Sequence, residues 1–325
     1  MAETQVVIIA HNDLDGIAAA SVIYRALKLR GAKIKLLYSQ PHSIEKILLM
    51  ASKPKLPSKI YIVDIAFNES AKEKLLNSLK ELAKRNVKIV WIDHHPSTIR
   101  FARELKESGV EVHAASTLSV APIVRKIFLE KTDDPEFYEK ILMLGEAGDR
   151  ARTLRQNKAL SEIYESVSFA LEEDPMDFEL RQHLTRLWGE KKQLIDDLIA
   201  LKAEKGRKRY DEIVSVAQDH VIADTSKLKI LDMTGKTMKG FSGRLAVETV
   251  EKEGKVVAVM LRSGYDEMVV VLRVPKSLNI NAGELARELG LKLNGSGGGH
   301  PKAAAVRLPI SKKMDVVKLL LQKVG

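Results

Sequence analysis

Side chains that bind divalent metals gather in four short segments, three of which directly follow apolar runs. These side chains are His11, Asp13 and Asp15, then Asp64, then Asp93, His94 and His95, and finally Asp149. A single aspartate in such a place is an ordinary helix cap, and a polar turn explains it equally well. Several carboxylates that lie close together, however, repel one another unless a cation or a partner neutralises them.

The residue types indicate which cation would serve. Five carboxylates and three imidazoles, in a chain without cysteine, form a ligand set that favours Mn²⁺ or Mg²⁺ over structural zinc. The number of ligands predicts two ions that share a bridging carboxylate, an arrangement that activates water and holds phosphoryl oxygens. The absence of cysteine also excludes disulfide frameworks and cysteine nucleophiles, so we expect a cytoplasmic protein.

A second group of candidates lies near the end of the chain, in the glycine-rich run 295–300. Glycines let backbone N–H groups approach an anion closely, which predicts a phosphate-binding loop, whereas a flexible hairpin loop is the alternative. The candidate binding residues of this run are Gly297, Gly298, Gly299 and His300. Arg262, at the end of a predicted strand, is either a bidentate phosphate clamp or a surface arginine. No dinucleotide fingerprint, P-loop or GxSxG segment is present, which argues against NAD, ATP and serine-hydrolase chemistry.

The elements that must position the first group alternate between strands and helices. Apolar runs at 6–10, 33–38, 59–63 and 87–92 are separated by segments with helical spacing. This pattern predicts a doubly wound parallel sheet, covered by helices on both faces, over residues 1–150. The carboxyl ends of parallel strands meet at one edge of a sheet, so we expect the metal-binding side chains to converge there. Asp149 falls in a predicted break between helices.

The remaining chain divides into two further segments. Residues 151–222 are almost wholly helical and highly charged, which predicts a helical insertion, and its apolar positions such as Trp188 are interpreted as packing core rather than as a docking site. Residues 223–325 change periodicity and predict a smaller mixed α/β domain. The predicted fold class is therefore α/β, with three domains at 1–150, 151–222 and 223–325.

Charge and hydropathy limit the partners. The 325 residues contain 53 Lys+Arg against 43 Asp+Glu, a formal charge of +10. Residues 223–325 alone carry 18 basic and 10 acidic groups, a net +8. A basic domain suits a polyanion such as nucleic acid, although a lysine-rich solvated surface would look the same. The apolar runs fall well short of the ~18 residues of a membrane span, and we expect neither a membrane segment nor a signal peptide.

Taken together, these motifs resemble those of the DHH phosphoesterase superfamily. The resemblance rests on His11-x-Asp13-x-Asp15-Gly16, Asp64, Asp93-His94-His95 and Asp149, in that order. The segment Gly297-Gly298-Gly299-His300 resembles the DHH-associated domain of the RecJ and nanoRNase branch. The match covers residues 5–150 and about 221–310, which is most of the chain.

The resemblance implies a role for each candidate. One Mn²⁺ would be held by His11, Asp13 and Asp64, and a second by Asp15, Asp64, His94 and Asp149, with Mg²⁺ or Co²⁺ as substitutes. Asp93 would orient a ligand and His95 would face the scissile phosphate, while water or hydroxide attacks phosphorus. Arg262 and residues Gly297, Gly298, Gly299 and His300 would hold the terminal nucleotide.

The resemblance also implies a substrate class. The layout with a helical insertion is similar to the archaeal helicase-associated DHH nuclease, so we expect a Mn²⁺-dependent 3′→5′ exonuclease that releases mononucleotides from single-stranded DNA or also RNA. The alternative is a nanoRNase or pAp phosphatase acting on very short oligonucleotides, and the low aromatic content of 5% favours it. A third reading is a non-catalytic scaffold. A DNA-repair or helicase partner and a homo-oligomer are left open.

Overall fold

The computed structural model describes residues 5–154 and 157–325, with side chains throughout these ranges except at 148–154 and 239. The chain forms two compact units, Met1–Leu171 with Pro175–Glu204, and Glu172–Asp174 with Lys205–Gly325. The segment expected to be a separate helical insertion is thus shared between the two units. The three-domain division stays a prediction. Among the described residues, no helix is both long and apolar enough to cross a bilayer.

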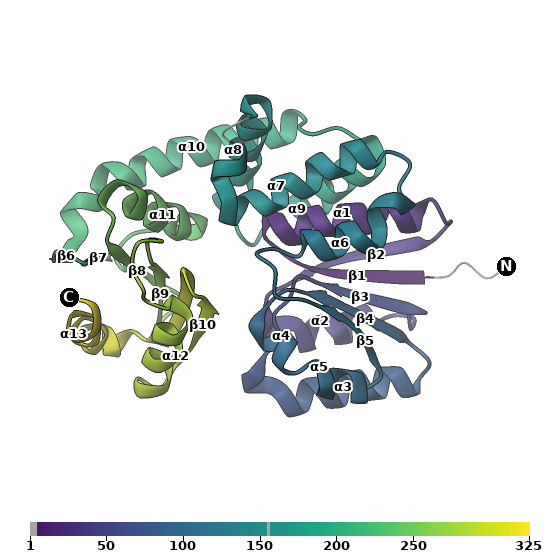
Figure 1. Ribbon diagram of the computed structural model, residues 1–325, viewed down its shortest axis with the longest axis horizontal. Helices are drawn as coiled ribbons and strands as arrows, with labels where there is room; N and C mark the ends of the chain where they lie inside the picture. Colours follow the sequence, from purple (N-terminus) through teal and green to yellow (C-terminus); the bar gives the residue numbers. More distant parts are fainter. Residues whose placement is uncertain (1–4, 155–156) are drawn as a thin grey trace. The chain divides into compact units, whose positions relative to one another are not determined.

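The described part of the first unit contains a five-stranded parallel sheet in the order β2-β1-β3-β4-β5 (Figure 1). Its strands are β1 (Gln5–His11), β2 (Lys33–Ser39), β3 (Lys59–Val63), β4 (Lys88–Asp93) and β5 (Val110–Ala114). Helices cover both faces, so the predicted doubly wound α/β fold is confirmed. The edge strand β5 is an addition to the four strands that the sequence predicts.

The helices of this unit fall into two layers. One face of the sheet carries α2 (Ile44–Ala51), α3 (Lys72–Lys84), α4 (Pro96–Arg100) and α5 (Ala102–Glu107). The other carries α1 (Leu14–Lys28), α6 (Ala121–Phe128), α7 (Pro135–Leu154) and α9 (Phe178–Arg186), while α8 (Lys158–Glu173) lies between α7 and α9 along the chain. Because β1 is buried on both faces, its sequence is a continuous apolar run: Val7 and Ile9 pack against α2 and α3, and the alternate residues face α1.

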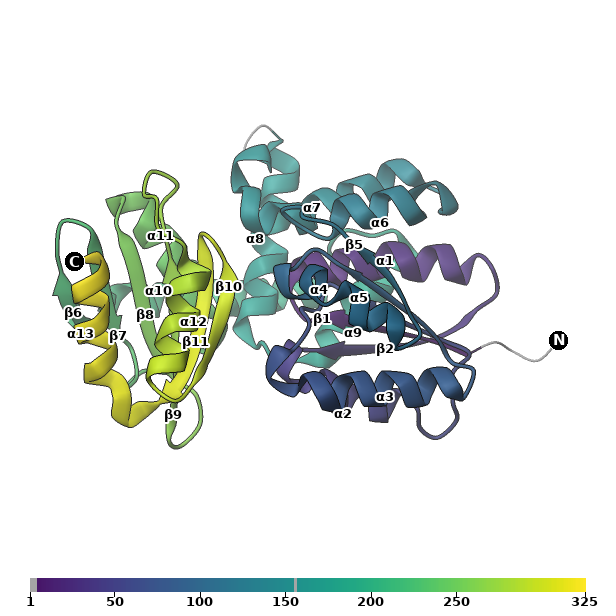
Figure 2. The same cartoon turned by 60° about the horizontal axis from the view of Figure 1, so that its bottom comes forward.

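The second unit is built on a six-stranded mixed sheet in the order β10-β11-β9-β8-β7-β6. Its strands are β6 (Val221–Asp224), β7 (Leu228–Asp232), β8 (Val256–Arg262), β9 (Glu267–Arg273), β10 (Ser296–His300) and β11 (Ala303–Pro309). Helices α12 (Ala282–Lys292) and α13 (Lys313–Val324) share one apolar core with the sheet, whereas α11 (Ser242–Glu253) packs on the opposite face (Figure 2). The helix α10 (Asp197–Ala217) precedes the sheet. The predicted mixed α/β C-terminal domain is therefore confirmed.

The glycine-rich run is not the loop that the sequence predicts. Residues 296–300 form the edge strand β10, which pairs antiparallel with β11. A Cβ atom on Gly297 would lie 2.3 Å from the carbonyl oxygen of Ala286, and one on Gly283 would lie 2.5 Å from that of Gly299. The glycines thus let the backbone of α12 pack directly on the backbone of β10. Gly298 differs, since a Cβ atom there would meet nothing within 4 Å.

Candidate metal centre

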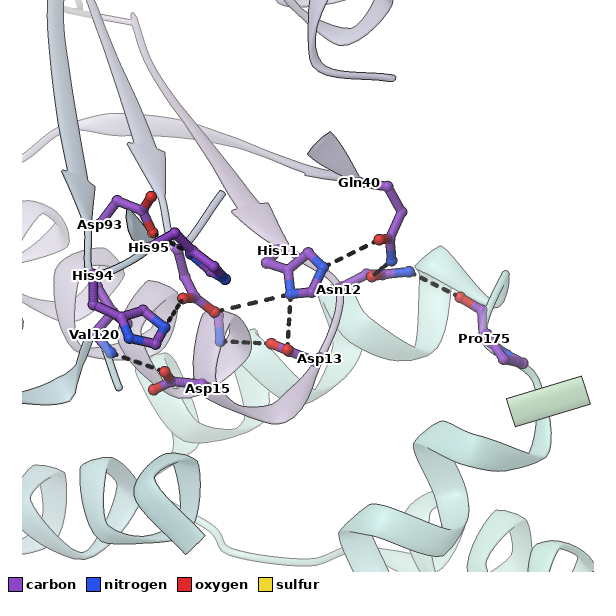
Figure 3. A network of polar contacts seen from close by, with 12 residues as sticks. His11, Asn12, Asp13, Asp15, Gln40, Asp93, His94, His95, Val120 and Pro175 are labelled. Carbon is purple, nitrogen blue, oxygen red and sulfur yellow. Dashed lines mark hydrogen bonds and ion pairs between the residues drawn. The ribbon is translucent and has the colours of Figure 1, made fainter. Parts of the chain in front are cut away.

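Three neighbouring strands end in the candidate metal ligands (Figure 3). The register of the sheet places Ala10, Val63 and Ile92 in one row, so the residues that follow them, His11, Asp64 and Asp93, lie in the next. The amide of Asp64 donates to the carbonyl of Ile92 at 2.9 Å, which continues the pairing of β3 and β4 by one residue. The convergence expected at the carboxyl edge of the sheet is therefore present for these strands.

Asp64 occupies the middle of the group. Its side chain is 2% exposed, and its backbone has φ 59°, a left-handed conformation that aspartate tolerates better than most residues. One carboxylate oxygen, Oδ1, lies 3.3 Å from Nε2 of His94, and the other, Oδ2, lies 3.9 Å from Nδ1 of His11. Asp64 thus presents one oxygen toward each imidazole, an arrangement that would suit a ligand shared by two ions.

Asp13 and Asp15 enter the group through the first turn of α1. Asp13 caps this helix by accepting from the amide of Gly16 at 3.1 Å, and its other oxygen lies 2.8 Å from Nδ1 of His11. Asp15 accepts from the amide of Val120 at 2.8 Å. A Cβ atom on Gly16 would lie 2.4 Å from the carbonyl oxygen of His11, so glycine is required where the helix folds back on the strand. Asp13 is therefore a helix cap and a candidate ligand at once.

The histidines after β4 are oriented by fixed acceptors. Nδ1 of His94 lies 3.1 Å from the carbonyl of Thr117, and because a carbonyl only accepts, this nitrogen carries the hydrogen and Nε2 faces Asp64. Nδ1 of His95 lies 2.7 Å from Oδ1 of Asp93, whose side chain is fully buried. Thr117 and Val120 both belong to the loop after β5, so the unpredicted strand carries the segment that orients two candidate ligands.

The electrostatics of this group call for positive charge. Burial and the neighbouring carboxylates of Asp15 and Asp13 hold the pKa of the Asp64 carboxyl well above its usual range. Burial lowers the pKa of His11, but Asp13 and Asp64 outweigh it and raise the pKa to about 10. Among the described residues, Oδ1 of Asp64 and Oδ2 of Asp93 are buried oxygens without a hydrogen-bond donor. A cation would satisfy both the excess charge and these oxygens.

The donor atoms form sets that could each hold such a cation. Within the first unit, three sets of side chains each offer ligand atoms that lie within 4.8 Å of one another. The sets are His11, Asp13 and Asp64; Asp15, Asp64 and His94; and Asp64, Asp93 and His95. Asp64 belongs to all three. The structure thus brings together seven of the eight side chains proposed from the sequence. Their roles, as catalytic residues for Asp93 and His95 and as metal ligands for the others, stay predictions.

The eighth candidate, Asp149, has a side chain outside the described residues. Its backbone lies within α7, which continues through residues 145–150, so the break between helices that the sequence predicts there is wrong. The same helix packs tightly on α1, because a Cβ atom on Gly145 would lie 3.0 Å from Cβ of Ala18 and 3.1 Å from Oδ1 of Asp15. Helix α7 therefore passes directly beside a candidate ligand.

The structure separates Arg262 from the glycine strand. His300 lies opposite Ala303, which lies opposite Arg273 of β9. Arg262 pairs instead with Met268, five positions before Arg273, which is roughly 17 Å along the sheet. Its guanidinium donates to the carbonyls that follow it in the β8–β9 turn, at 3.2 and 2.7 Å. Arg273 is the arginine in the row of His300. Sequence inspection missed it, since only the strand register distinguishes the two arginines.

A cavity of about 340 Å³ lies beside the loop that orients His94 and Asp15. Its lining residues are Ser116, Thr117, Leu118, Ser119, Pro122 and Glu146. Leu118 is 55% exposed, and the hydroxyls and Glu146 add hydrogen-bonding groups around it. The cavity thus combines apolar and hydrogen-bonding side chains beside the candidate ligands.

The fold and the site together define the class of the protein. Residues 5–145 match the DHH family, N-terminal domain, and residues 227–325 match the DHHA1 domain. The chain belongs to the DHH superfamily of phosphoesterases, with a DHHA1 domain at its C-terminal end. Members of this family are phosphoesterases or nucleases, which supports a hydrolase.

Individual proteins with a similar sequence or fold share only a small part of their residues with this chain. The chain is 26% identical to an uncharacterised protein of Methanocaldococcus jannaschii over 273 residues, which are 82% of this chain and 72% of that protein. The pGpG-specific phosphodiesterase PggH of Vibrio cholerae has a similar fold, with 16% identity and a TM-score of 0.59 over 99% of this chain and 98% of that one. RecJ of Thermus thermophilus, solved with Mn²⁺, is 15% identical with a TM-score of 0.65, over 97% of this chain and 51% of that one.

Proposed function

We propose that this protein is a Mn²⁺-dependent 3′→5′ exonuclease that removes mononucleotides from single-stranded DNA, with RNA as a further substrate and with Mg²⁺ or Co²⁺ able to replace Mn²⁺. The observation that carries the proposal is the position of Asp64, buried between two imidazoles and next to the carboxylates of Asp13 and Asp15. Asp149 completes the proposed ligand set. A two-ion centre of this kind serves phosphoryl transfer.

In the proposed reaction, the metal ions, Asp93 and His95 have separate roles. Two bound divalent ions would supply charge neutralisation for the phosphate and a water acidic enough to attack at neutral pH. Asp93 accepts the Nδ1 hydrogen of His95 and so fixes the orientation of the ring, in which Nε2 is the nitrogen that would face the substrate. His95, whose side chain is 22% exposed, would stabilise the charge of the leaving oxygen or, as an imidazolium with a hydrogen on each ring nitrogen, donate the Nε2 proton to it.

The second unit would bind the terminal nucleotide. Its net charge of +8 suits a polyanion. Gly298, which has open space where a side chain would stand, and His300 belong to β10, and Arg273 shares a row of the sheet with His300. These features favour Gly298, His300 and Arg273 as phosphate contacts, whereas Gly297 and Gly299 remain contacts that only the family resemblance implies. The earlier assignment of Arg262 to the same task stays a prediction.

The test is digestion of oligonucleotides that carry a label at one end only, in the presence of Mn²⁺. We expect the 3′ label to leave first as a mononucleotide, and an Asp15→Asn variant to leave both substrates intact. Release of the 5′ label first would overturn the direction. Full hydrolysis by the variant would point to a non-catalytic scaffold and a contaminating nuclease.

A second candidate is a phosphodiesterase of very short oligonucleotides or pAp. Its support is that the fold similarity to PggH extends over nearly the whole of both chains, while that to RecJ covers about half of RecJ. Comparing a dinucleotide, pAp and a 20-mer under one Mn²⁺ concentration separates the two candidates. A repair or helicase partner, a homo-oligomer and a cytoplasmic location stay sequence-based predictions.

A further inference from the structure

The side chain of Gln40 links the metal centre to a distant segment of the first unit (Figure 3). Gln40 directly follows β2, the edge strand to which the sequence assigns no candidate ligand. Its Oε1 lies 3.2 Å from Nε2 of His11, and its Nε2 donates to Oδ1 of Asn12. Asn12 in turn donates from Nδ2 to the carbonyl of Pro175 at 3.1 Å. Four groups thus form one continuous chain of hydrogen bonds.

The direction of every bond in this chain follows from its far end. The carbonyl of Pro175 can only accept, so Asn12 must present its NH₂ group there and its oxygen to Gln40. An oxygen at that point needs a donor, so Gln40 presents its own NH₂ group to Asn12 and its oxygen to His11. That oxygen accepts, so Nε2 of His11 carries a hydrogen.

A hydrogen on Nε2 of His11 determines the state of Nδ1, the other nitrogen of the same ring. With the hydrogen held on Nε2, the neutral imidazole that His11 must become in order to bind a metal ion has its lone pair on Nδ1. Nδ1 lies 2.8 Å from Asp13 and 3.9 Å from Asp64, inside the group of candidate ligands. We propose that Gln40 is a positioning residue that fixes His11 in the tautomer whose Nδ1 binds the metal ion, with the Pro175 carbonyl setting the direction of the relay. This inference rests on the proposed metal centre.

A buried arginine holds the relay in place. Arg181 of α9 is 2% exposed, and its Nε donates to the backbone carbonyl of Asn12 at 2.8 Å. Its other nitrogens donate to the carbonyls of Asp177 at 2.9 Å and of Leu171 at 3.1 Å. The segment that carries Pro175 is thereby tied to the backbone between two candidate ligands. This gives the helices after residue 157, which the sequence left without a chemical interpretation, a task at the metal centre.

The first experiment measures Mn²⁺ affinity by calorimetry on the full chain. Gln40→Leu removes the acceptor for His11, and we expect Mn²⁺ to bind about 10–100-fold more weakly, the usual loss when the partner of a ligating histidine is removed. Gln40→Glu keeps an acceptor at the same place and should restore most of this loss. The matched control is Gln193→Leu, an exposed glutamine outside the relay, which should bind Mn²⁺ as the wild type does. Circular dichroism checks that each variant is folded.

A double variant tests whether the links act as one unit. Asn12→Leu and Gln40→Leu interrupt the same relay, so the two losses of affinity should not add when both are present. Additive losses would show that Asn12 and Gln40 act separately, and would overturn the role of Pro175 in setting the direction.

The second experiment reads the tautomer directly. In ¹⁵N NMR spectra of the full chain with Zn²⁺ as a diamagnetic probe, we expect Nε2 of His11 to carry a hydrogen and Nδ1 to be the coordinated nitrogen. Coordination through Nε2, or wild-type Mn²⁺ affinity in Gln40→Leu, would overturn the relay while leaving the metal centre intact. Failure of the wild-type protein to bind Mn²⁺ would instead overturn the metal centre together with the relay. The NMR result stands on the wild type alone, so it decides the matter even where a variant fails to fold.

Discussion

At the scale of single residues, the central side chain of the candidate site is that of Asp64. Asp64 ends a strand in a left-handed conformation and lies between two imidazoles, while burial and neighbouring carboxylates raise its pKa. A carboxyl whose pKa is higher in the folded than in the unfolded protein binds its proton more tightly when folded. Its ionisation therefore destabilises the metal-free protein as pH rises above the unfolded pKa of about 4.

The first prediction concerns Asp64→Asn, a change that keeps both the shape and the tolerance for left-handed backbone. We expect hydrolysis to fall by more than about 100-fold, beyond the loss caused by a supporting residue. The same variant should be more stable than the wild type in excess chelator at pH 7, because the repulsion from Asp13 and Asp15 is relieved. Thermal unfolding in EDTA checks the second point. A variant that is both inactive and destabilised in EDTA would mean that Asp64 acts through the fold instead.

At the scale of elements, the sequence predicts those strands whose burial leaves a continuous apolar run. Strands β1, β3 and β4 are of this kind. The sequence therefore also predicts where the residues directly after these strands lie. Strand β5 reads Val-Glu-Val-His-Ala, which alternates and lies at an edge, so it offers a weaker signal. The glycines of β10 predict a loop because glycine is disfavoured in strands, but close packing of α12 outweighs that preference.

Contacts across the sheet are what sequence inspection could not supply. Gln40 is an ordinary polar residue until the register places the end of β2 beside the end of β1, where Ser39 lies opposite His11. Arg262 and Arg273 both end strands, and only the pairing of β9 with β11 reveals which of them shares a row with His300. Site residues that directly follow strands can therefore be predicted from the sequence. The residues that support them cannot, because their contacts depend on how the strands pair.

The second prediction compares two adjacent glycines of β10. Gly297→Ala would place a Cβ atom 2.3 Å from the carbonyl oxygen of Ala286, and we expect a loss of about 1–3 kcal/mol in the free energy of unfolding. Gly298→Ala meets open space, so its free energy of unfolding should change by less than about 1 kcal/mol. Urea unfolding of both variants checks this. Equal losses in the two variants would contradict the close packing of α12 on β10.

The third prediction concerns the contact between β7 and α13. Burial would raise the pKa of the Asp232 carboxyl, but hydrogen bonds from Lys313 at 2.7 Å and from Thr234 outweigh it and hold the pKa below its usual value. A lowered pKa means that this carboxylate stabilises the fold above the unfolded pKa of about 4 and loses that effect as pH falls toward the folded pKa. Asp232→Asn should therefore lower the unfolding temperature at pH 7 more than at pH 3. Asp266→Asn, at an exposed turn, is the control, and an equal effect at both pH values would contradict the assignment.

At the scale of the whole molecule, the chain forms two units, and seven side chains of the candidate metal centre lie in the first of them. A metal ion that binds only to the folded protein stabilises the folding unit that contains its binding site. The two units are joined by chain crossings at residues 171–172, 174–175 and 204–205. Each unit has its own sheet and its own apolar core, which allows their unfolding to be observed separately.

The fourth prediction follows from this division. Mn²⁺ at about 100 times its Kd should stabilise the first unit by about 2.7 kcal/mol and leave the second unit unchanged. Differential scanning calorimetry should show one transition that moves with Mn²⁺ and returns with EDTA, and another that does not move. A single transition that shifts as a whole would show that the two units unfold together, and no shift would speak against a metal centre.

The turn between β1 and α1 also offers an internal reporter. Because the carboxylate of Asp13 accepts from the amide of Gly16, any ion that draws this carboxylate toward itself also pulls on the first turn of the helix. The rate at which deuterium replaces the Gly16 hydrogen should then differ between the loaded and the empty protein. Occupancy could be followed at one backbone position, with no substrate present and no side chain altered.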